Sequence, residues 1–163
     1  MSSINIIQVG NIFESDAQTI VNTVNCVGAM GKGLALQYKK RYPSMFKAYV
    51  RLCENGLLDI GKLWLYKTDS RWILNFPTKY HWRHPSKEEY LESSLQKFLD
   101  TYKEKGITSI AFPLLGASNG GIHPDVSLKI MRRYLDRCEI PVTIYLDYNR
   151  SDPGLFEEKL NKV

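Results

Sequence analysis

Cysteine and histidine are scarce in this sequence, and long apolar runs are missing. The 163 residues include three cysteines and three histidines, and no C-x-x-C pair occurs. An odd number of unpaired cysteines argues against a disulfide framework, and the spacing argues against a zinc site. No apolar run approaches the roughly 18 to 20 residues of a membrane span, and the first residues lack the features of a secretory signal. We therefore expect a soluble, cytoplasmic protein that binds no metal and no membrane.

The length and composition are those of an ordinary globular domain. Hydrophobic residues make up 44% and charged residues 24% of the chain, and a chain of this length can bury a substantial core. The net charge of +5 permits a polyanionic partner without requiring one. We predict a single domain over residues 1–163.

Alternating strand and helix patterns predict a three-layer α/β/α domain around a mixed sheet. Ser44 and Ser86 are expected N-caps, and Gly106 is an expected helix stop. A short Asp69-Ser70 turn indicates that one pair of strands forms a hairpin. The expected strands cover 4–9, 19–24, 62–68, 71–76, 109–112 and 141–146, and the expected helices cover 34–41, 44–54, 87–105, 125–138 and 155–160.

A glycine-rich loop follows the β-branched run at residues 20–24. Gly28, Gly31 and Gly33 allow the backbone N–H groups to approach a ligand closely, and a helix begins at Leu34. Strand, loop and helix N-terminus together are typical of an anion site suited to phosphate. The order G-x-x-G-x-G fits neither the P-loop nor the dinucleotide fingerprint, so a tight turn without a ligand is the alternative.

A second loop repeats this design after the strand at 109–112. It contains Gly116, Gly120 and Gly121 and leads into a helix near Pro124. Open α/β sheets bind ligands at the carboxyl ends of their strands, where both loops are expected. Two such loops suit a ligand that carries two phosphates.

Three motifs in this order resemble the macrodomain family. They are the stretch from Val21 to Gly33, the sequence Asn-Phe-Pro-Thr-Lys at 75–79, and the stretch from Pro113 to Gly121. Within macrodomains they look most like the branch of DarG, which removes ADP-ribose from DNA, and its relative terminal ADP-ribose protein glycohydrolase. The resemblance runs from about Gly10 to Ile122 and implies ADP-ribose as ligand, with no cofactor.

The resemblance also implies which residues bind ADP-ribose. A buried asparagine must be hydrogen-bonded, so Asn22 and Asn25 either support the loop or face ligand hydroxyls. By resemblance Asn25 faces the distal ribose and takes part in catalysis, Asn22 supports the loop, and the adenine lies near 9–12. The expected binding residues are Val9, Gly10, Asn11, Asn22, Thr23, Asn25, Met30, Gly31, Lys32, Gly33, Leu34, Thr78, Leu115, Gly116, Ala117, Ser118, Asn119, Gly120 and Gly121.

Lys79 is the expected catalytic residue, because it matches the catalytic lysine of the DarG-like branch. A neutral amine can attack C1″ of the distal ribose or its opened aldehyde form. Its pKa must then be lowered by desolvation or by nearby cations, for which Lys32, Arg83 and the histidines are candidates. Lys32 also stands where other ADP-ribosylhydrolase macrodomains carry an aspartate, which disfavours their mechanism here. The alternative for Lys79 is an exposed loop lysine.

Two further residues have open interpretations. The glycohydrolase relative carries an aspartate after its second loop, whereas this chain has His123, followed by Asp125. His123 or Asp125 is a candidate general acid or base, and His123 is equally a candidate helix cap. Cys26 lies in the first loop, where packing is favoured over a role as nucleophile because no histidine is near it in sequence.

Residues 80–83 mix aromatic rings with cations. Tyr80, His81, Trp82 and Arg83 suit single-stranded nucleic acid, whose bases stack on rings while cations contact phosphates. The alternative is that Trp82 packs on the core. We therefore expect an ADP-ribosyl glycohydrolase that acts on a modified DNA base, with ADP-ribosylated single-stranded DNA and a cognate ADP-ribosyltransferase toxin as partners. A reader without catalysis and a hydrolase of ADP-ribose on protein carboxylates are the alternatives.

Overall fold

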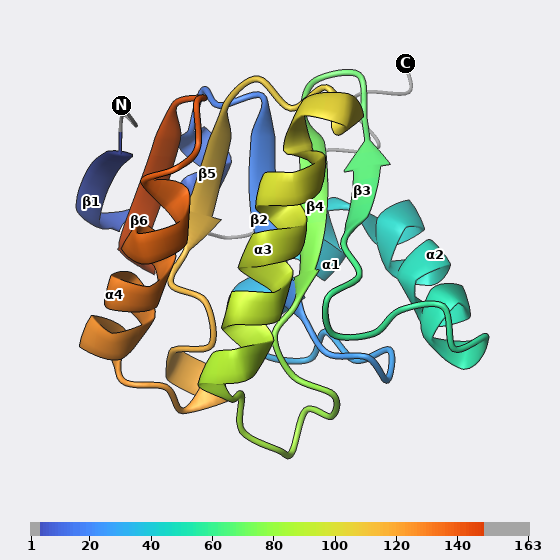
Figure 1. Cartoon of the computed structure of the whole chain (residues 1–163). Helices are drawn as coiled ribbons and strands as arrows, with labels where there is room; N and C mark the ends of the chain where they lie inside the picture. Colours follow the sequence, from blue (N-terminus) through green and yellow to red (C-terminus); the bar gives the residue numbers. More distant parts are fainter. Residues whose placement is uncertain (1–3, 149–163) are drawn as a thin grey trace.

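The computed structural model describes residues 4–148, and these form one mixed sheet flanked by helices (Figure 1). The strand order is β1-β6-β5-β2-β4-β3, with only β3 antiparallel to its neighbour. The strands are β1 (Ile4–Gly10), β2 (Thr19–Val24), β3 (Trp64–Lys67), β4 (Trp72–Pro77), β5 (Ile110–Pro113) and β6 (Val142–Tyr148). The helices are α1 (Gly33–Arg41), α2 (Pro43–Glu54), α3 (Glu88–Lys105) and α4 (Pro124–Leu135), with 3-10 turns η1 (Ile12–Glu14) and η2 (Ser118–Gly120).

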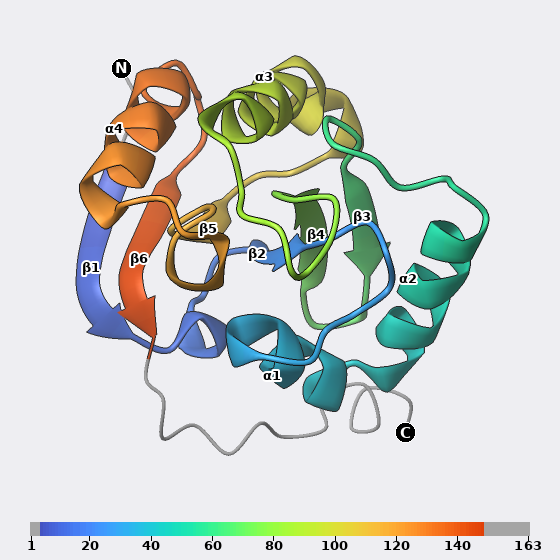
Figure 2. The ribbon, with the colours of Figure 1, turned by 90° about the horizontal axis from the view of Figure 1, so that it is seen from below.

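The helices divide between the two faces of the sheet, which confirms the predicted three-layer arrangement. Figure 2 shows α3 and α4 on one face, α1 on the other, and α2 beside the β3 edge. One core cluster joins the sheet to α3 and α4 through buried side chains such as Leu95 and Met131. The other joins it to α1 and α2 through Tyr38 and Tyr49.

The register of the central strands brings three loops to one edge. β2 runs parallel to β4, with Asn22 opposite Asn75, and parallel to β5, with Ile20 opposite Ala111. Parallel neighbours end on the same side of a sheet, so the segments after β2, β4 and β5 all begin there. Figure 2 looks onto this edge.

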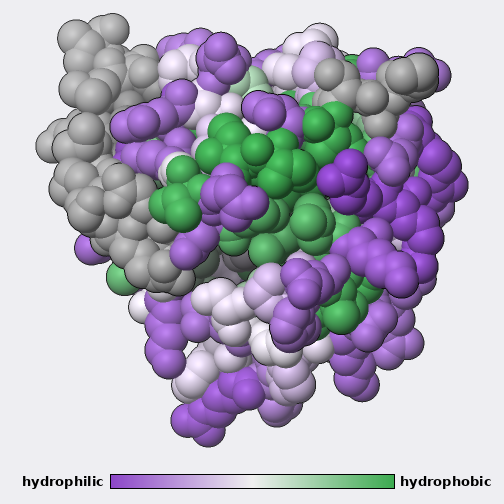
Figure 3. All heavy atoms as spheres, turned by 90° about the vertical axis from the view of Figure 1, so that its left-hand side faces the viewer, coloured by the Kyte–Doolittle hydropathy of each residue, from purple (hydrophilic) through white to green (hydrophobic). Residues whose placement is uncertain are grey.

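The far end of the sheet is formed by β1. Figure 3 shows apolar residues gathered on the side of the molecule that this end presents, bordered by hydrophilic ones. Among residues 4–148, no helix is both long and apolar enough to cross a membrane.

Most predicted elements are confirmed, including the hairpin of β3 and β4 and the stop of α3 at Gly106, whose φ is +81°. Both predicted serine caps are wrong. Helix α2 begins at Pro43, which suits the first turn because it needs no N–H there, so Ser44 lies inside the helix. Helix α3 is preceded by Lys87 without a side-chain cap, and the Ser86 hydroxyl is buried without a hydrogen-bond partner among the described residues.

The last two predicted helices have different outcomes. Helix α4 ends at Leu135 rather than at 138, in a turn where the N–H of Cys138 bonds to the carbonyl of Leu135. The predicted helix at 155–160 lies outside the described residues.

Candidate functional site

A cavity of about 590 Å³ lies at the carboxyl ends of β2, β4, β5 and β6. Both glycine loops and the segment after β4 line it. This volume lies within the range of small-molecule sites, roughly 300 to 1,000 Å³. The two loops predicted from separate parts of the sequence therefore meet in one site.

The first loop leads directly into the N-terminus of α1. Gly33, Leu34 and Ala35 line the cavity, and the first N–H groups of a helix have no partner within it. The N-cap residue Lys32 makes no capping bond with its side chain. Unpaired N–H groups and the helix dipole favour an anion at this position.

Asn25 holds the first loop in shape. Its Oδ1 accepts hydrogen bonds from the N–H groups of Val27 at 3.1 Å and Ala29 at 3.3 Å, and its Nδ2 donates to the Ala29 carbonyl at 2.8 Å. The Tyr49 hydroxyl lies 2.7 Å from this Oδ1 and 2.8 Å from the Asn25 carbonyl. Burial, above all, raises the pKa of Tyr49, which keeps the hydroxyl a neutral donor. Asn25 lines the cavity as well, so its role toward a ribose stays a prediction.

Asn22 lies one layer deeper and joins two strands. Its side chain is fully buried, and its Nδ2 donates to the Oδ1 of Asn75 at 3.1 Å. It is not among the residues that line the cavity. Its Nδ2 also lies 3.8 Å from the Sδ of Met30 in the first loop, and support of that loop by Asn22 stays a prediction.

The second loop has a strained and tightly packed backbone. Gly116 has a φ of +69°, and a Cβ there would lie 2.9 Å from side-chain carbons of both Ile122 and Leu91. Ser118 has a φ of +58°, in the left-handed region that non-glycine residues rarely adopt. Strain of this kind often marks ligand-binding loops. All residues from Gly116 to Gly120 line the cavity.

Lys79 connects the segment after β4 to the second loop. Its Nζ donates to the Trp82 carbonyl at 3.1 Å and to the Asn119 carbonyl at 3.2 Å. Burial, followed by the positive charge of Lys32, lowers the pKa of Lys79. The predicted direction of the shift is confirmed, and Lys32 is the cation that contributes to it. Lys79 lines the cavity, so the interpretation as a freely exposed lysine is wrong.

The structure decides between the alternatives for Cys26 and His123. Burial, with smaller effects of Asp59 and Cys53, raises the pKa of Cys26 to about 12, so the thiol stays protonated and packing is favoured over nucleophilic attack. His123 is the N-cap of α4, where its Nδ1 accepts from the N–H of Asp125 at 3.1 Å. The capping interpretation is confirmed. Neither His123 nor Asp125 lines the cavity, which leaves an acid–base role without a geometric basis.

Of the aromatic side chains at residues 80–83, Trp82 alone lines the cavity. Trp82 lines it and is 46% exposed, so the alternative that it packs on the core is wrong. The guanidinium of Arg83 lies 4.7 Å from the centre of the Trp82 ring, and the His81 ring stacks on Trp82 at 5.3 Å. Tyr80 is 47% exposed and packs edge-on against Tyr90.

Some predicted binding residues do not reach the cavity. Met30 and Leu115 are buried in the two cores, and Val9 is 65% exposed on β1. The residues that do not line the cavity are Val9, Gly10, Asn11, Asn22, Met30, Leu115 and Gly121, and those that do are Thr23, Asn25, Gly31, Lys32, Gly33, Leu34, Thr78 and Gly116 to Gly120.

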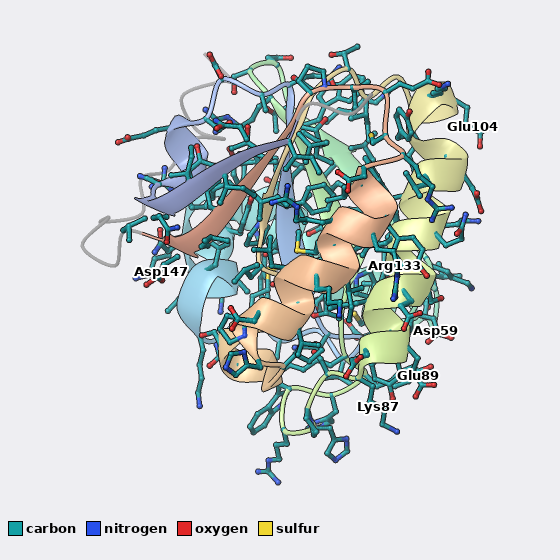
Figure 4. All side chains as sticks on the ribbon, turned by 60° about the vertical axis from the view of Figure 1, so that its left-hand side comes forward. Asp59, Lys87, Glu89, Glu104, Arg133 and Asp147 are labelled. Carbon is teal, nitrogen blue, oxygen red and sulfur yellow. The ribbon has the colours of Figure 1, made fainter. Side chains whose placement is uncertain are left out.

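The last strand, β6, also contributes to the cavity, and no motif predicted this. Tyr145, Leu146 and Asp147 line the cavity because β6 lies between β1 and β5 and ends at the same edge. Figure 4 shows Asp147 at the end of this strand. Strand order is not readable from hydrophobic periodicity, so these residues carried no signal in the sequence.

Comparison with known proteins identifies the relatives of this chain. The family model of the Macro domain matches residues 21–131. A "DNA ADP-ribosyl glycohydrolase" of Thermus aquaticus is 47% identical over 126 residues, which are 74% of this chain and 35% of the relative. A "DNA ADP-ribosyl transferase-DNA ADP-ribosyl glycohydrolase fusion protein" of Thermosipho africanus is 37% identical, over 90% of this chain and 42% of the relative.

A solved structure shares the fold closely. It is titled "Thermosipho africanus DarTG in complex with ADP-ribose" and superimposes with a TM-score of 0.85 at 35% identity, over 93% of this chain and 43% of that one. This chain thus spans less than half the length of these relatives.

Proposed function

This chain belongs to the macrodomain family, and from that premise we propose that it is a hydrolase that removes ADP-ribose from a modified DNA base, with Lys79 as the reactive group. One observation carries the proposal. Lys79 lies in the wall of a cavity that both glycine loops line, and burial and Lys32 lower its pKa.

The two loops would hold the pyrophosphate from opposite sides. The N-terminus of α1 offers N–H groups on one side, and the backbone from Gly116 to Asn119 would offer them on the other, since the N–H of Gly120 already donates to the Ala117 carbonyl. Lys79, Thr78 and Trp82 line the side where the segment after β4 contributes, which would receive the distal ribose and the attached base. Ile12 and Tyr145 line the cavity as well and would meet the adenosine end.

The chemistry requires an uncharged amine. The Nζ lone pair attacks C1″ of the ribose, the bond from C1″ to the base nitrogen breaks, and the base nitrogen takes up, through water, the proton that the attached Nζ loses. The attached sugar opens to a Schiff base, and water adds to it to release ADP-ribose and restore the amine. Lowering the lysine pKa raises the uncharged fraction at neutral pH.

A second candidate function follows from the resting contacts of Lys79. Two carbonyl acceptors, those of Trp82 and Asn119, stabilise the charged amine and tie it to the protein. If those contacts persist when ADP-ribose is bound, the chain is a reader that binds the nucleotide without cleaving its link.

The test compares two substrates and three proteins. Release of ADP-ribose is measured from a single-stranded oligonucleotide modified on one base and from a protein modified on glutamate, with the wild type, Lys79→Ala and the control Lys129→Ala. Lys129 is an exposed lysine of α4 away from the cavity. Binding of free ADP-ribose and the melting temperature are measured for each, so that loss of folding is distinguished from loss of chemistry.

The proposal expects release from the oligonucleotide by the wild type and Lys129→Ala, and none by Lys79→Ala. Tight binding of ADP-ribose without release from either substrate would leave the reader. Release from the protein alone would replace the DNA base by a carboxylate as the target.

We also propose that a cognate ADP-ribosyltransferase produces the modified DNA. The fusion of a transferase with a glycohydrolase in the Thermosipho africanus relative supports this partner. The described residues form one sheet with two flanking cores, which supports a single macrodomain as the organisation of this chain.

A further inference from the structure

A second, smaller cleft lies beside the main cavity. Its volume is about 280 Å³, and Tyr80, His84, Pro85, Lys87 and Tyr90 line it. None of these residues lines the main cavity. The cleft is therefore a separate concavity with two phenol rings and one ammonium group in its wall.

One short segment forms the wall between the two concavities. Lys79 and Trp82 line the main cavity, whereas Tyr80, His84 and Lys87 of the same segment line the smaller cleft. A single strand whose modified base enters the main cavity would pass its neighbouring nucleotide across this wall. The two concavities thus share a wall made by residues that follow one another in the chain.

The segment is held in place before any ligand arrives. The Tyr80 carbonyl accepts from the N–H of Cys26 at 3.0 Å, which ties the segment to the first glycine loop. The N–H of Ser86 donates to the Gly120 carbonyl at 2.8 Å, which ties it to the second. A preorganised site loses less entropy on binding, which favours ligand binding over loose surface contact.

The rings of the cleft suit a nucleobase. Tyr80 and Tyr90 meet edge to face with their centres 5.2 Å apart, and Tyr80 remains 47% exposed. The Nζ of Lys87 lies 5.8 Å from the centre of the Tyr90 ring. Exposed aromatic faces beside a cation are the features that take a stacked base and its phosphate.

The surrounding charges limit the cleft to one nucleotide. Lys87 lies at the end of α3 that meets the segment, but Glu89 and Asp59 lie there too (Figure 4). After burial, the negative charges of Asp59 and Glu89 are among the causes that raise the pKa of Tyr80. Carboxylates repel a continuing line of phosphates. These two carboxylates disfavour a run of phosphates on the Lys87 side of the cleft, so we expect one phosphate there.

We infer that the cleft of Tyr80, Tyr90 and Lys87 is a subsite for the single nucleotide that neighbours the ADP-ribosylated one in a DNA strand. This inference rests on the proposed function, since it assumes that the main cavity takes ADP-ribose on DNA. It adds that the protein distinguishes a modified base within a strand from an isolated modified nucleoside.

The test uses three kinds of substrate that carry the same modified base. They are the isolated modified nucleoside, a single-stranded oligonucleotide, and oligonucleotides in which one nucleotide beside the modified base is abasic. KM and kcat for ADP-ribose release and equilibrium binding by anisotropy are measured for the wild type, Tyr90→Ala, Lys87→Ala and the control Tyr134→Ala. Tyr134 is a partly buried tyrosine of α4 that lines neither concavity.

Loss of a base–aromatic stack predicts that Tyr90→Ala weakens oligonucleotide binding and raises its KM roughly tenfold, with little change in kcat. The nucleoside should be unaffected, and one of the abasic substrates should lose the same factor with the wild type and nothing further with Tyr90→Ala. The wild type should show a slope of log Kd against log salt that is steeper for the oligonucleotide than for ADP-ribose by about 0.7, the value for one phosphate on a single strand. Lys87→Ala should remove that difference.

Failure of this inference is separable from failure of the proposed function. If the wild type releases ADP-ribose from nucleoside and oligonucleotide with equal KM, and neither abasic neighbour matters, the subsite does not exist although the enzyme does. If no substrate is cleaved, the proposed function fails, and the binding data alone show whether the subsite exists. Equal affinity of the wild type and Tyr90→Ala for the modified oligonucleotide would then overturn the subsite.

Discussion

Replacing Gly116 by alanine tests the described packing of the second loop. Gly116 has a φ of +69°, and an added Cβ would lie 2.9 Å from carbons of Ile122 and Leu91 and 3.2 Å from the Cβ of Ser86. The left-handed conformation costs a non-glycine residue about 1–2 kcal/mol. Overpacking adds about 1–2 kcal/mol, in the lower part of its usual range, because the partly exposed Ile122 can yield whereas the buried Leu91 has little room.

The net loss of unfolding free energy in Gly116→Ala also depends on the unfolded chain. Alanine reduces the freedom of the unfolded state, which returns about 0.5 kcal/mol. We therefore expect Gly116→Ala to lower the free energy of unfolding by about 1.5–3.5 kcal/mol and the melting temperature by roughly 3–14 °C for a domain of this size. The loop amides that face the cavity should shift as well, so that ADP-ribose binds at least tenfold more weakly by titration calorimetry.

The chain provides a matched control at Gly56. Its φ is +65°, nearly that of Gly116, but no atom lies within 4 Å of the position that a Cβ would take. Gly56→Ala should therefore cost only about 1 kcal/mol, from conformation alone. It should leave ADP-ribose binding unchanged, since Gly56 follows α2 away from the cavity. If urea unfolding gave equal losses for the two variants, the close packing behind Gly116 would be refuted.

Three further changes test the electrostatics and the bracing of the site. Lys32→Gln removes the charge that helps to lower the pKa of Lys79. The pKa of Lys79 should therefore rise, and the pH–rate profile of ADP-ribose release should move to higher pH. An unmoved profile would contradict an effect of the Lys32 charge on Lys79. In the wild type, the depressed pKa of Lys79 reduces stability at pH values below it, and this penalty should fade as pH rises toward the ordinary lysine value. Tyr49→Phe leaves the Asn25 oxygens without their hydroxyl donor and should cost about 1–3 kcal/mol in urea unfolding, with weaker ADP-ribose binding; no loss in either would show that the hydroxyl does not brace the loop. His123→Ala should lower the free energy of unfolding by about 0.5–2 kcal/mol through loss of the helix cap, while release of ADP-ribose stays unchanged. His123→Ser should restore the stability. Loss of ADP-ribose release in both variants would indicate that His123 takes part in the reaction.

Local patterns in the sequence were sufficient to predict the elements that form the site. The β-branched run of β2, the glycines after it and the helix at Leu34 are contiguous, so periodicity and turn chemistry locate them within one or two residues. The same holds for β5 and the loop from Gly116. That both loops line one cavity follows from parallel pairing of β2 and β5, which the alternation of strands and helices already predicts.

Contacts between distant residues could not be predicted in this way. Tyr49 braces Asn25 from a helix that begins eighteen residues further along the chain, and Tyr145 joins the cavity because β6 inserts between β1 and β5. Both depend on how elements pack, which hydrophobic periodicity does not encode. The failed caps at Ser44 and Ser86 have a similar cause, because the preceding chain and not the side chain decides where each helix begins.

The properties of Lys79 depend both on a local sequence motif and on contacts with distant residues. Its motif identifies the residue, but the state of its amine depends on Asn119, forty residues away, whose carbonyl accepts from Nζ. That carbonyl and the one of Trp82 favour the charged amine, whereas burial and, after it, the charge of Lys32 lower the pKa of Lys79. Asn119 belongs to the loop that lines the cavity, so the hydrogen bond from Nζ to its carbonyl is a contact that a bound ligand would have to displace to favour the uncharged amine. The proposed hydrolase requires that this contact breaks, whereas the proposed reader keeps it.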